Sequence, residues 1–170
     1  MASPSKGVGV HADYFLKIQG IDGESAAKNH TNEIDLLSFS WGEDQVGTAG
    51  TGKGAGMGKV QMQNFAITKF VDKASPSLFL YCANGKHIPE VTLSCQRAGG
   101  SQEVYLKVEM KEVIVSSYHT NGSNTEMLPT EAVTFNFAKI AFSYWPQEAT
   151  GASGGVIKKG WDLQQNAEQS

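Results

Sequence analysis

Charged residues are scarce in this sequence, and arginine is almost absent. Asp, Glu, Lys and Arg make up 18% of the 170 residues, compared with roughly a quarter in typical soluble domains. Arg97 is the only arginine and the net charge is −3, so the chain has little with which to attract phosphates or read bases. We therefore expect no nucleic-acid partner. We also expect something other than charge, such as a subunit interface, to cover part of the surface.

Cysteine is equally scarce. Cys82 and Cys95 are the only two cysteines, and both have apolar neighbours in the sequence. A small buried thiol suits those surroundings better than a disulfide does. We expect both residues to be core thiols, with a disulfide as the alternative.

Long hydrophobic runs are missing as well. No apolar run approaches the roughly 20 residues that cross a bilayer. Residues 1–12 lack the apolar segment and the cleavage pattern of a secretory signal peptide. We therefore expect no membrane insertion, no signal peptide, and synthesis in a reducing cytoplasm. If the protein leaves the cell, we expect it to do so without the general secretory pathway.

The usual motifs of catalysis are also absent. No G-x-S-x-G element is present, neither cysteine has the surroundings of an activated thiolate, and paired carboxylates such as Glu43 and Asp44 fall in solvated turns. No metal-binding spacing links the four histidines, which are His11, His30, His87 and His119. We predict no catalytic residue, no metal and no cofactor, and hence no enzyme.

One glycine-rich segment comes close to a nucleotide-binding motif. Gly47 to Lys53 has the G-x-x-x-x-G-K spacing, but Gly54 stands where Mg²⁺ coordination needs Ser or Thr. The glycines that follow would also break the helix that a P-loop requires. Two interpretations remain, a solvated loop or an arm that orders against a neighbouring subunit, and the residues alone favour neither.

Much of the chain alternates apolar and polar residues with the period of a β-strand. Ser75 as N-cap, Pro76 after it and Gly85 as a stop predict one short helix at residues 75–84, with Leu78, Phe79 and Cys82 available for the core. Strands are predicted at residues 13–19, 33–41, 59–62 and 65–70, and from residue 89 onward, most clearly at 91–96, 104–111, 133–145 and 156–163.

The apolar face changes phase within two of these strands. The alternation shifts near Glu112, and it shifts again beyond Ala138 and Lys139. One extra residue flips the apolar face and bends the sheet, as the corners of a barrel require. Long bent strands with a single helix indicate a mainly β fold, a closed or nearly closed antiparallel barrel. We expect one domain at residues 13–165, between a flexible lead at 1–12 and a polar tail at 166–170.

The predicted strand at residues 33–41 has two unlike faces. Leu37, Phe39 and Trp41 form an apolar face, while Ser38 and Ser40 place small hydroxyls on the other. The second face suits water or a partner rather than a core. Trp41, like Trp145 and Trp161, stands in an alternating pattern that favours a core position.

A series of short segments stands out by its order and spacing, from about Tyr14 to Asn166. The segments are Phe15-Leu16-Lys17-Ile18, Gly23-Glu24-Ser25, His30, Glu33-Ile34-Asp35, Ser38-Phe39-Ser40-Trp41-Gly42, the glycine-rich loop, Thr68-Lys69, Asp72-Lys73, Gly85-Lys86-His87, Ala98-Gly99-Gly100, Lys111-Glu112-Val113, Asn136-Phe137-Ala138 and Gly160-Trp161. Taken together, these segments closely resemble the haemolysin-coregulated protein (Hcp) family of bacterial type VI secretion.

The resemblance implies two antiparallel sheets that form a barrel, with one short flanking helix and a long glycine-rich extended loop. It further implies a homohexameric ring, stacking of rings into a secreted tube, a spike protein and a contractile sheath as partners, and effector proteins in the lumen. Ser38 and Ser40 match the strand that lines the lumen. The loop that would pack on the adjacent ring comprises Val46, Gly47, Thr48, Gly50, Gly52, Lys53, Gly54, Gly56 and Gly58. The location implied is the bacterial cytoplasm, then the extracellular space or a target cell.

A competing interpretation is a monomeric binding module, such as a carbohydrate-binding β-sandwich. Modules of that class present aromatic platforms on an exposed face. The positions of the three tryptophans therefore distinguish the two hypotheses.

Overall fold

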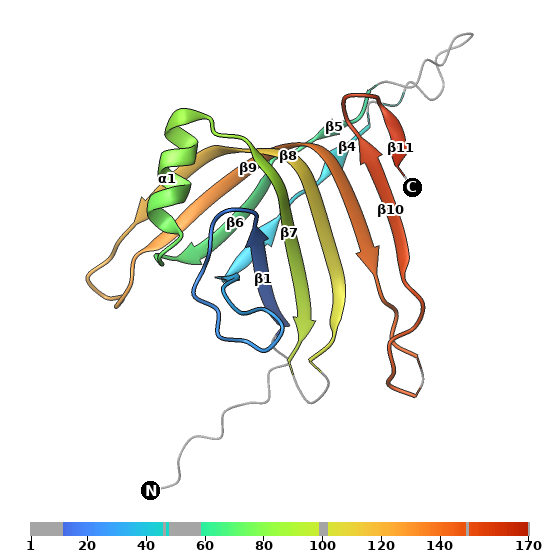
Figure 1. The fold of residues 1–170 in the computed structure, drawn as a ribbon, viewed down its shortest axis with the longest axis horizontal. Helices are drawn as coiled ribbons and strands as arrows, with labels where there is room; N and C mark the ends of the chain where they lie inside the picture. Colours follow the sequence, from blue (N-terminus) through green and yellow to red (C-terminus); the bar gives the residue numbers. More distant parts are fainter. Residues whose placement is uncertain (1–11, 46, 48–58, 99–101, 149, 170) are drawn as a thin grey trace, which may run out of the picture.

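The computed structural model describes residues 12–45, 47, 59–98, 102–148 and 150–169, which form antiparallel β-structure with one helix (Figure 1). The elements are β1 (Ala12–Ile18), β2 (Ile34–Leu36), β3 (Ser38–Ser40), β4 (Glu43–Asp44), β5 (Gln61–Met62), β6 (Phe65–Phe70), α1 (Ser75–Asn84), β7 (Ile88–Arg97), β8 (Val104–Asn121), β9 (Thr130–Tyr144), β10 (Ile157–Asp162) and β11 (Ala167–Gln169).

Strand β9 is the centre of the main sheet. It pairs with β8 along one edge, from Leu106↔Tyr144 to Asn121↔Thr130. Its other edge is divided, because β6 pairs with its first half and β10 with its second half. On the far side of β8 the order continues through β7 and β1 to β2, while β3 pairs with β6. All of these pairs are antiparallel, as the alternation of the sequence predicts.

Closure into a barrel is not confirmed by the described strand pairs. β2 pairs only with β1, and β3 pairs only with β6, so the ladders do not form a complete circuit. A nine-stranded sheet and the separate two-stranded sheet of β4 and β5 account for all described strands. Mainly antiparallel β-structure with one flanking helix is therefore what the sequence predicted correctly.

The single strand predicted at residues 33–41 is in fact two strands. The chain bends at Leu37, where it leaves β1 and joins β6, and the backbone N–H of Leu37 donates to the carbonyl of Thr68 at 2.8 Å. The prediction that Leu37 shares an apolar face with Phe39 is wrong, because the Leu37 side chain is exposed while Phe39 packs against the core. One residue at the bend shifts the phase of the alternation.

Both predicted changes of phase are present. Met110 and Val113 are each buried, as are Phe137 and Ile140, so the apolar side flips between the members of each pair. Glu112 has a φ of 54°, in the left-handed region that a non-glycine residue adopts only under constraint. The two flips lie opposite each other, since Val113 pairs with Phe137. A further register shift, which the sequence did not predict, falls between Val115 and Ser117.

The helix begins and ends at the predicted residues, and Gly85 terminates it with a φ of 66°. Two details differ. Ser75 is the first helical residue rather than the N-cap, which is Ala74. Phe79 is exposed rather than in the core, although Leu78 is fully buried as expected. α1 packs on β8, and Phe79 meets the ring of Tyr118 there edge to face.

Apolar side chains from the facing sides of the strands make one core. Cys95 is buried in it and Cys82 packs at its margin, and neither forms a disulfide. At the end of the chain, residues 167–169 add β11 to β10. The polar composition of residues 166–170 gave no sign of this strand.

Candidate interaction surfaces

Ser38 and Ser40 are exposed on β3 and point away from the core, as the sequence predicted. The ladders place them in line with other small residues. Ser38 is opposite Thr68 of β6, and their hydroxyl oxygens lie 2.5 Å apart. Ser40 is opposite Ala66, which is itself opposite Thr134 of β9. Ser40 is therefore one end of a row that crosses four strands, and Ser38 begins the neighbouring row on the same face.

The other end of this row lies on β8. Thr134 pairs with Ser117, and the register shift at that point lets two successive serines reach the same partner. The Oγ1 atom of Thr134 lies 2.7 Å from the Oγ atom of Ser116 and 2.6 Å from that of Ser117. We call these side chains the hydroxyl face: Ser38, Ser40, Thr68, Ser116, Ser117 and Thr134.

The hydroxyl face has no charged member, and side-chain hydrogen bonds join Ser38 to Thr68 and Thr134 to Ser116 and Ser117. Exposed hydroxyls exchange partners with water at little net cost, because a typical hydrogen bond contributes only about 1 kcal/mol after that exchange. Such a surface can contact many proteins and hold none of them tightly. Sequence reasoning found only Ser38 and Ser40. The polar alternation of residues 65–70 and 130–136 would have pointed to Thr68 and Thr134.

Of the predicted stacking loop, the structure describes only Gly47, which is exposed. The other predicted members lie outside the described residues; they are Val46, Thr48, Gly50, Gly52, Lys53, Gly54, Gly56 and Gly58. The flanks of the loop are described. Glu43 pairs with Met62 and Asp44 with Gln61, and the N–H of Gln63 donates to the carbonyl of Gly42 at 2.9 Å. This short hairpin, β4–β5, is the base of the loop.

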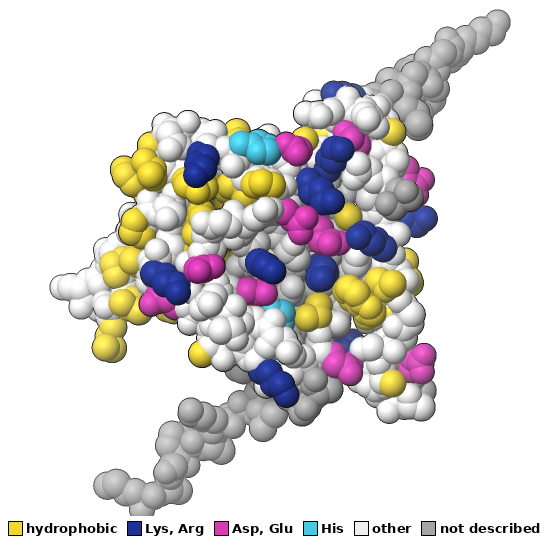
Figure 2. Space-filling model, viewed as in Figure 1, with side chains coloured by type: hydrophobic (Ala, Val, Ile, Leu, Met, Phe, Trp, Pro, Cys, Tyr) yellow, Lys and Arg dark blue, Asp and Glu magenta, His cyan; other side chains and the backbone are white. Residues whose placement is uncertain are grey.

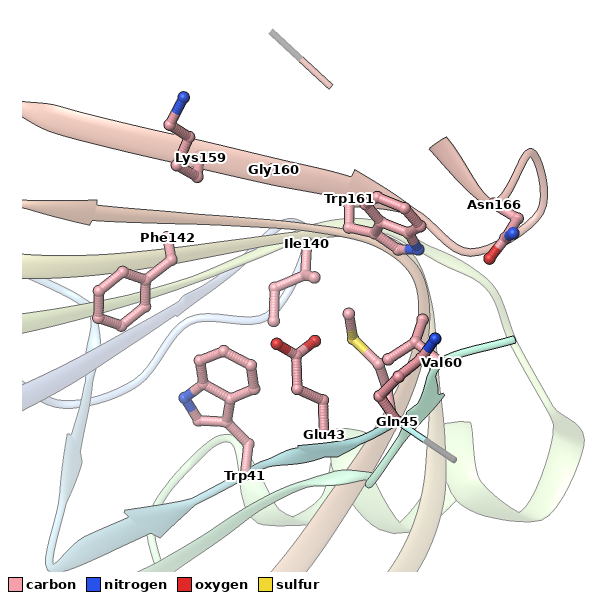
Figure 3. Close-up of a pocket in the computed structure, with 11 residues that line it drawn as sticks. Trp41, Glu43, Gln45, Val60, Ile140, Phe142, Lys159, Gly160, Trp161 and Asn166 are labelled. Carbon is pink, nitrogen blue, oxygen red and sulfur yellow. The ribbon is translucent and has the colours of Figure 1, made fainter. Parts of the chain in front are cut away.

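A groove of about 580 Å³ lies between that hairpin and the β9–β10 edge (Figure 3). Its walls are mainly apolar and include Trp41, Met62, Ile140, Phe142 and Trp161, while the carboxylate of Glu43 also points into it. The rings of Trp41 and Phe142 are 6.0 Å apart. The prediction of core positions for Trp41 and Trp161 is only partly correct, since both pack against the core and also line this open groove. Trp145 is half-buried and lies beyond the end of β9.

Lys69 is the centre of a buried ionic cluster beneath α1. Its Nζ atom donates to Glu131 at 2.9 Å, to Asp72 at 2.8 Å and to the hydroxyl of Ser75 at 3.3 Å. Tyr118 donates its hydroxyl hydrogen to the other oxygen of Glu131. Burial, followed by this contact with Glu131, raises the pKa of Tyr118. Every charge has a partner, so the cluster fixes the helix to the sheet and does not form an open reactive site.

Other groups also lack the features of a reactive centre. Burial raises the pKa of the Cys95 thiol to about 12, which keeps it protonated and unreactive near neutral pH. The described residues contain no group of three or more side chains able to hold a metal ion. Within the described ranges, no helix has the length and hydrophobicity of a membrane span.

Known proteins resemble this chain over nearly its whole length. The model of the family "Type VI secretion system effector, Hcp" matches residues 15–144. "Protein hcp1" of Pseudomonas aeruginosa is 46% identical over 158 residues, covering 92% of this chain and 98% of that protein.

Solved structures agree. The "Structure of a type six secretion system protein" superposes with a TM-score of 0.88 at 30% identity, covering 94% of this chain and all of the other. The crystal structure of Hcp1 from Salmonella typhimurium gives a TM-score of 0.77 at 35% identity, covering 93% and 99%. With the family match, the identity and the shared fold in agreement, this chain belongs to the Hcp family of type VI secretion proteins.

Proposed function

We propose that this chain is the structural subunit of a type VI secretion tube. Six copies form a ring, and the rings stack into a tube that carries effector proteins in its lumen. The observation that carries the proposal is the hydroxyl face, which presents small uncharged groups on a rigid sheet in a member of the Hcp family. Lining the lumen with such a face would let varied cargo enter and leave.

The sheet closes into a barrel in the proposed assembly. The chain passes directly from β2 to β3 through Leu37, and its N–H donates to Thr68 of β6. Only this bend separates the β1–β2 ladder from the β3–β6 ladder. A closed sheet would leave fewer exposed strand edges for unwanted pairing with other chains.

The glycine-rich loop, residues 46–58, packs on the adjacent ring in this proposal. Glycines allow a backbone to approach a neighbour closely, and the β4–β5 hairpin gives the loop a fixed base. The spike and the contractile sheath are the further partners. The subunit is made in the bacterial cytoplasm and reaches the extracellular space or a target cell with the tube.

Light scattering of the purified protein tests the ring. We expect a particle six times the 18.2 kDa mass of the chain. A monomer at every concentration would instead favour the alternative, a carbohydrate-binding module that uses Trp41 and Trp161. In that case a soluble oligosaccharide should change the tryptophan fluorescence, whereas the tube subunit should give no response.

Deletion of residues 47–58 tests the stacking role. We expect the deleted protein to keep its ring mass in light scattering but to form tubes at least tenfold less readily in negative-stain images. Equal tube formation by the deleted and the full-length protein would disprove the assignment of the loop.

A substitution in the hydroxyl face tests the lumen role. Ser40→Gln places a long side chain there without adding charge, and we expect it to reduce co-purification of an effector expressed from the same secretion system. Thr31→Gln, on the exposed connection between β1 and β2, is the matched control. Unchanged effector recovery with Ser40→Gln would contradict the assignment.

A further inference from the structure

The core-facing side of the main sheet extends beyond the elements that cover it. Following one row across the strands, Val108 of β8 is fully buried, but its partner Phe142 on β9 is 37% exposed. In the next row Tyr144 is 39% exposed, and its partner Ile157 on β10 is 58% exposed. Exposure therefore rises toward β10 along the same apolar face. Apolar surface of this kind, continuous with a core, indicates a contact with another molecule.

The groove beside this face contains a buried donor without an acceptor. The indole Nε1 of Trp161 is buried and has no hydrogen-bond partner among the described residues. Figure 3 shows the ring of Trp161 over the groove, whereas the ammonium of Lys159 points away from it. That nitrogen is closed to an acceptor from outside the subunit, so the apolar ring is the part of Trp161 that a partner can contact.

A second apolar surface lies at the opposite end of the molecule, where Figure 1 shows α1 and the connection between β8 and β9. Figure 2 shows hydrophobic side chains gathered along this end. We call it the hairpin patch; its exposed members are Phe70, Phe79, Leu80, Met127 and Leu128. Met127 is fully exposed and protrudes from the connection, with its backbone outside any strand ladder.

We infer that the hairpin patch of one subunit packs in the groove of the next, with Met127 and Leu128 as the inserted residues. A methionine side chain adapts to an irregular apolar cavity, and the groove, at about 580 Å³, has room for both side chains. The inference rests on the proposed ring, and it names the surfaces that make it.

The position of the two surfaces decides the symmetry of this contact. A projecting patch and a receiving groove at opposite ends of one chain make a heterologous, head-to-tail contact, which closes into a ring when the rotation per subunit allows it. The charges near the contact are of both signs, because Lys159 and Glu43 line the groove and Glu126 precedes Met127. The occupant is thus a second copy of this chain.

Cross-linking between two exposed positions tests the contact. We would prepare Met127→Cys/Lys159→Cys and treat it with a short bismaleimide. We expect a ladder from dimer to the full oligomer in denaturing gels. Each single substitution should remain monomeric on the gel, because neither position meets its own copy. The controls are the unsubstituted protein, which keeps Cys82 and Cys95, and Lys28→Cys/Lys159→Cys, whose first position lies on another surface.

The outcomes separate this inference from the proposed function. If light scattering shows a ring while Met127→Cys/Lys159→Cys cross-links no more than the control pair, that result would overturn the proposed contact but not the proposed ring. A protein that is monomeric at every concentration would overturn both.

A second pair of variants measures the strength of the contact. Met127→Glu should raise the concentration of half-assembly at least tenfold, because a second carboxylate would lose hydration in the groove and approach Glu43, which lines it. Met127→Leu should stay within about twofold of the parent. The position is fully exposed in the subunit, so neither change should lower monomer stability. Equal assembly by the two variants would contradict the inserted role of Met127.

Discussion

The two halves of β9 have similar sequences but different surroundings. In the first half Val133, Phe135 and Phe137 point inward and are almost completely buried. In the second half Ile140, Phe142 and Tyr144 occupy the same side of the sheet, and burial is lost along the strand until Tyr144 is 39% exposed. The first half pairs with β6 and faces the main core, while the second half pairs with β10 and borders the open groove.

This difference shows that apolar alternation predicts which face of the sheet a side chain occupies. It does not predict how deeply that side chain is buried. Both halves turn large apolar residues the same way. Only the first has a complete core above it, and the second has a surface available for assembly. The predictions below test this division, from the largest expected effect to the smallest.

Removing the charge of Lys69 should have the largest effect. Lys69→Met would leave Glu131, at the start of β9, buried without its cation, and we expect a loss of about 3–5 kcal/mol in the free energy of unfolding measured with urea. Lys158→Met is the matched control, because its pair with Glu109 is exposed to solvent, and it should cost less than about 1 kcal/mol. A similar loss of unfolding free energy in both variants would contradict the buried position of the ion pair beside the first half of β9.

The same deletion in the two halves of β9 should separate them directly. Phe135→Ala would open a cavity in the core, whereas Phe142→Ala would trim a partly exposed ring. We expect Phe135→Ala to be the less stable by about 2–3 kcal/mol in monomer unfolding. For assembly the order should reverse, with Phe142→Ala forming rings less readily in light scattering. If both variants unfolded at the same denaturant concentration, the two halves of β9 would not differ in their contribution to the core.

Acid should weaken the second half through Asp162. Two backbone N–H groups, those of Gln165 and Gln164, and the ammonium of Lys139 hold the pKa of Asp162 below its ordinary value of 3.8. A carboxyl with a lowered folded-state pKa contributes stability above its unfolded pKa and loses it as the pH falls through the folded value. Asp162→Asn should therefore be less stable than the parent at pH 6. The difference should shrink below about pH 4 in urea titrations, and a constant difference would contradict this account.

The smallest effect should come from the hydroxyl face. Thr134→Val removes the hydroxyl that joins Ser116 and Ser117 but keeps the shape of the side chain. Water can satisfy the two serine hydroxyls. We therefore expect the free energy of unfolding, obtained from the shift in the thermal midpoint, to change by less than about 1 kcal/mol. A loss above about 2 kcal/mol would mean that the face is needed for stability and is not simply a contact surface.

Local features of the fold could be predicted from the sequence because local rules decide them. Alternation defined most strands, Gly85 defined the end of α1, and the paired apolar residues revealed the phase changes at Glu112 and Ala138. The bend at Leu37 could not be predicted, since it results from a change of partner strand, from β1 to β6, that leaves no mark on the residue itself.

The candidate surfaces were predictable only in part. Ser38 and Ser40 stood out because they interrupt an apolar strand, but their grouping with Thr134 depends on the register of strands distant in sequence. The burial of Lys69 was not predictable, because Glu131, its fully buried partner, is 62 residues away in the sequence. The open groove was equally hidden, because the same tryptophan pattern suits both a core and a groove wall.

The long ladder between β8 and β9 has a mechanical consequence. Its hydrogen bonds run from Leu106↔Tyr144 to Asn121↔Thr130, all perpendicular to the strands. A force directed along the strands loads these bonds together, so that they resist as a group, whereas a force that parts the strands at one end breaks them one after another. The subunit should therefore tolerate thrust along β8 and β9 far better than peeling at their ends.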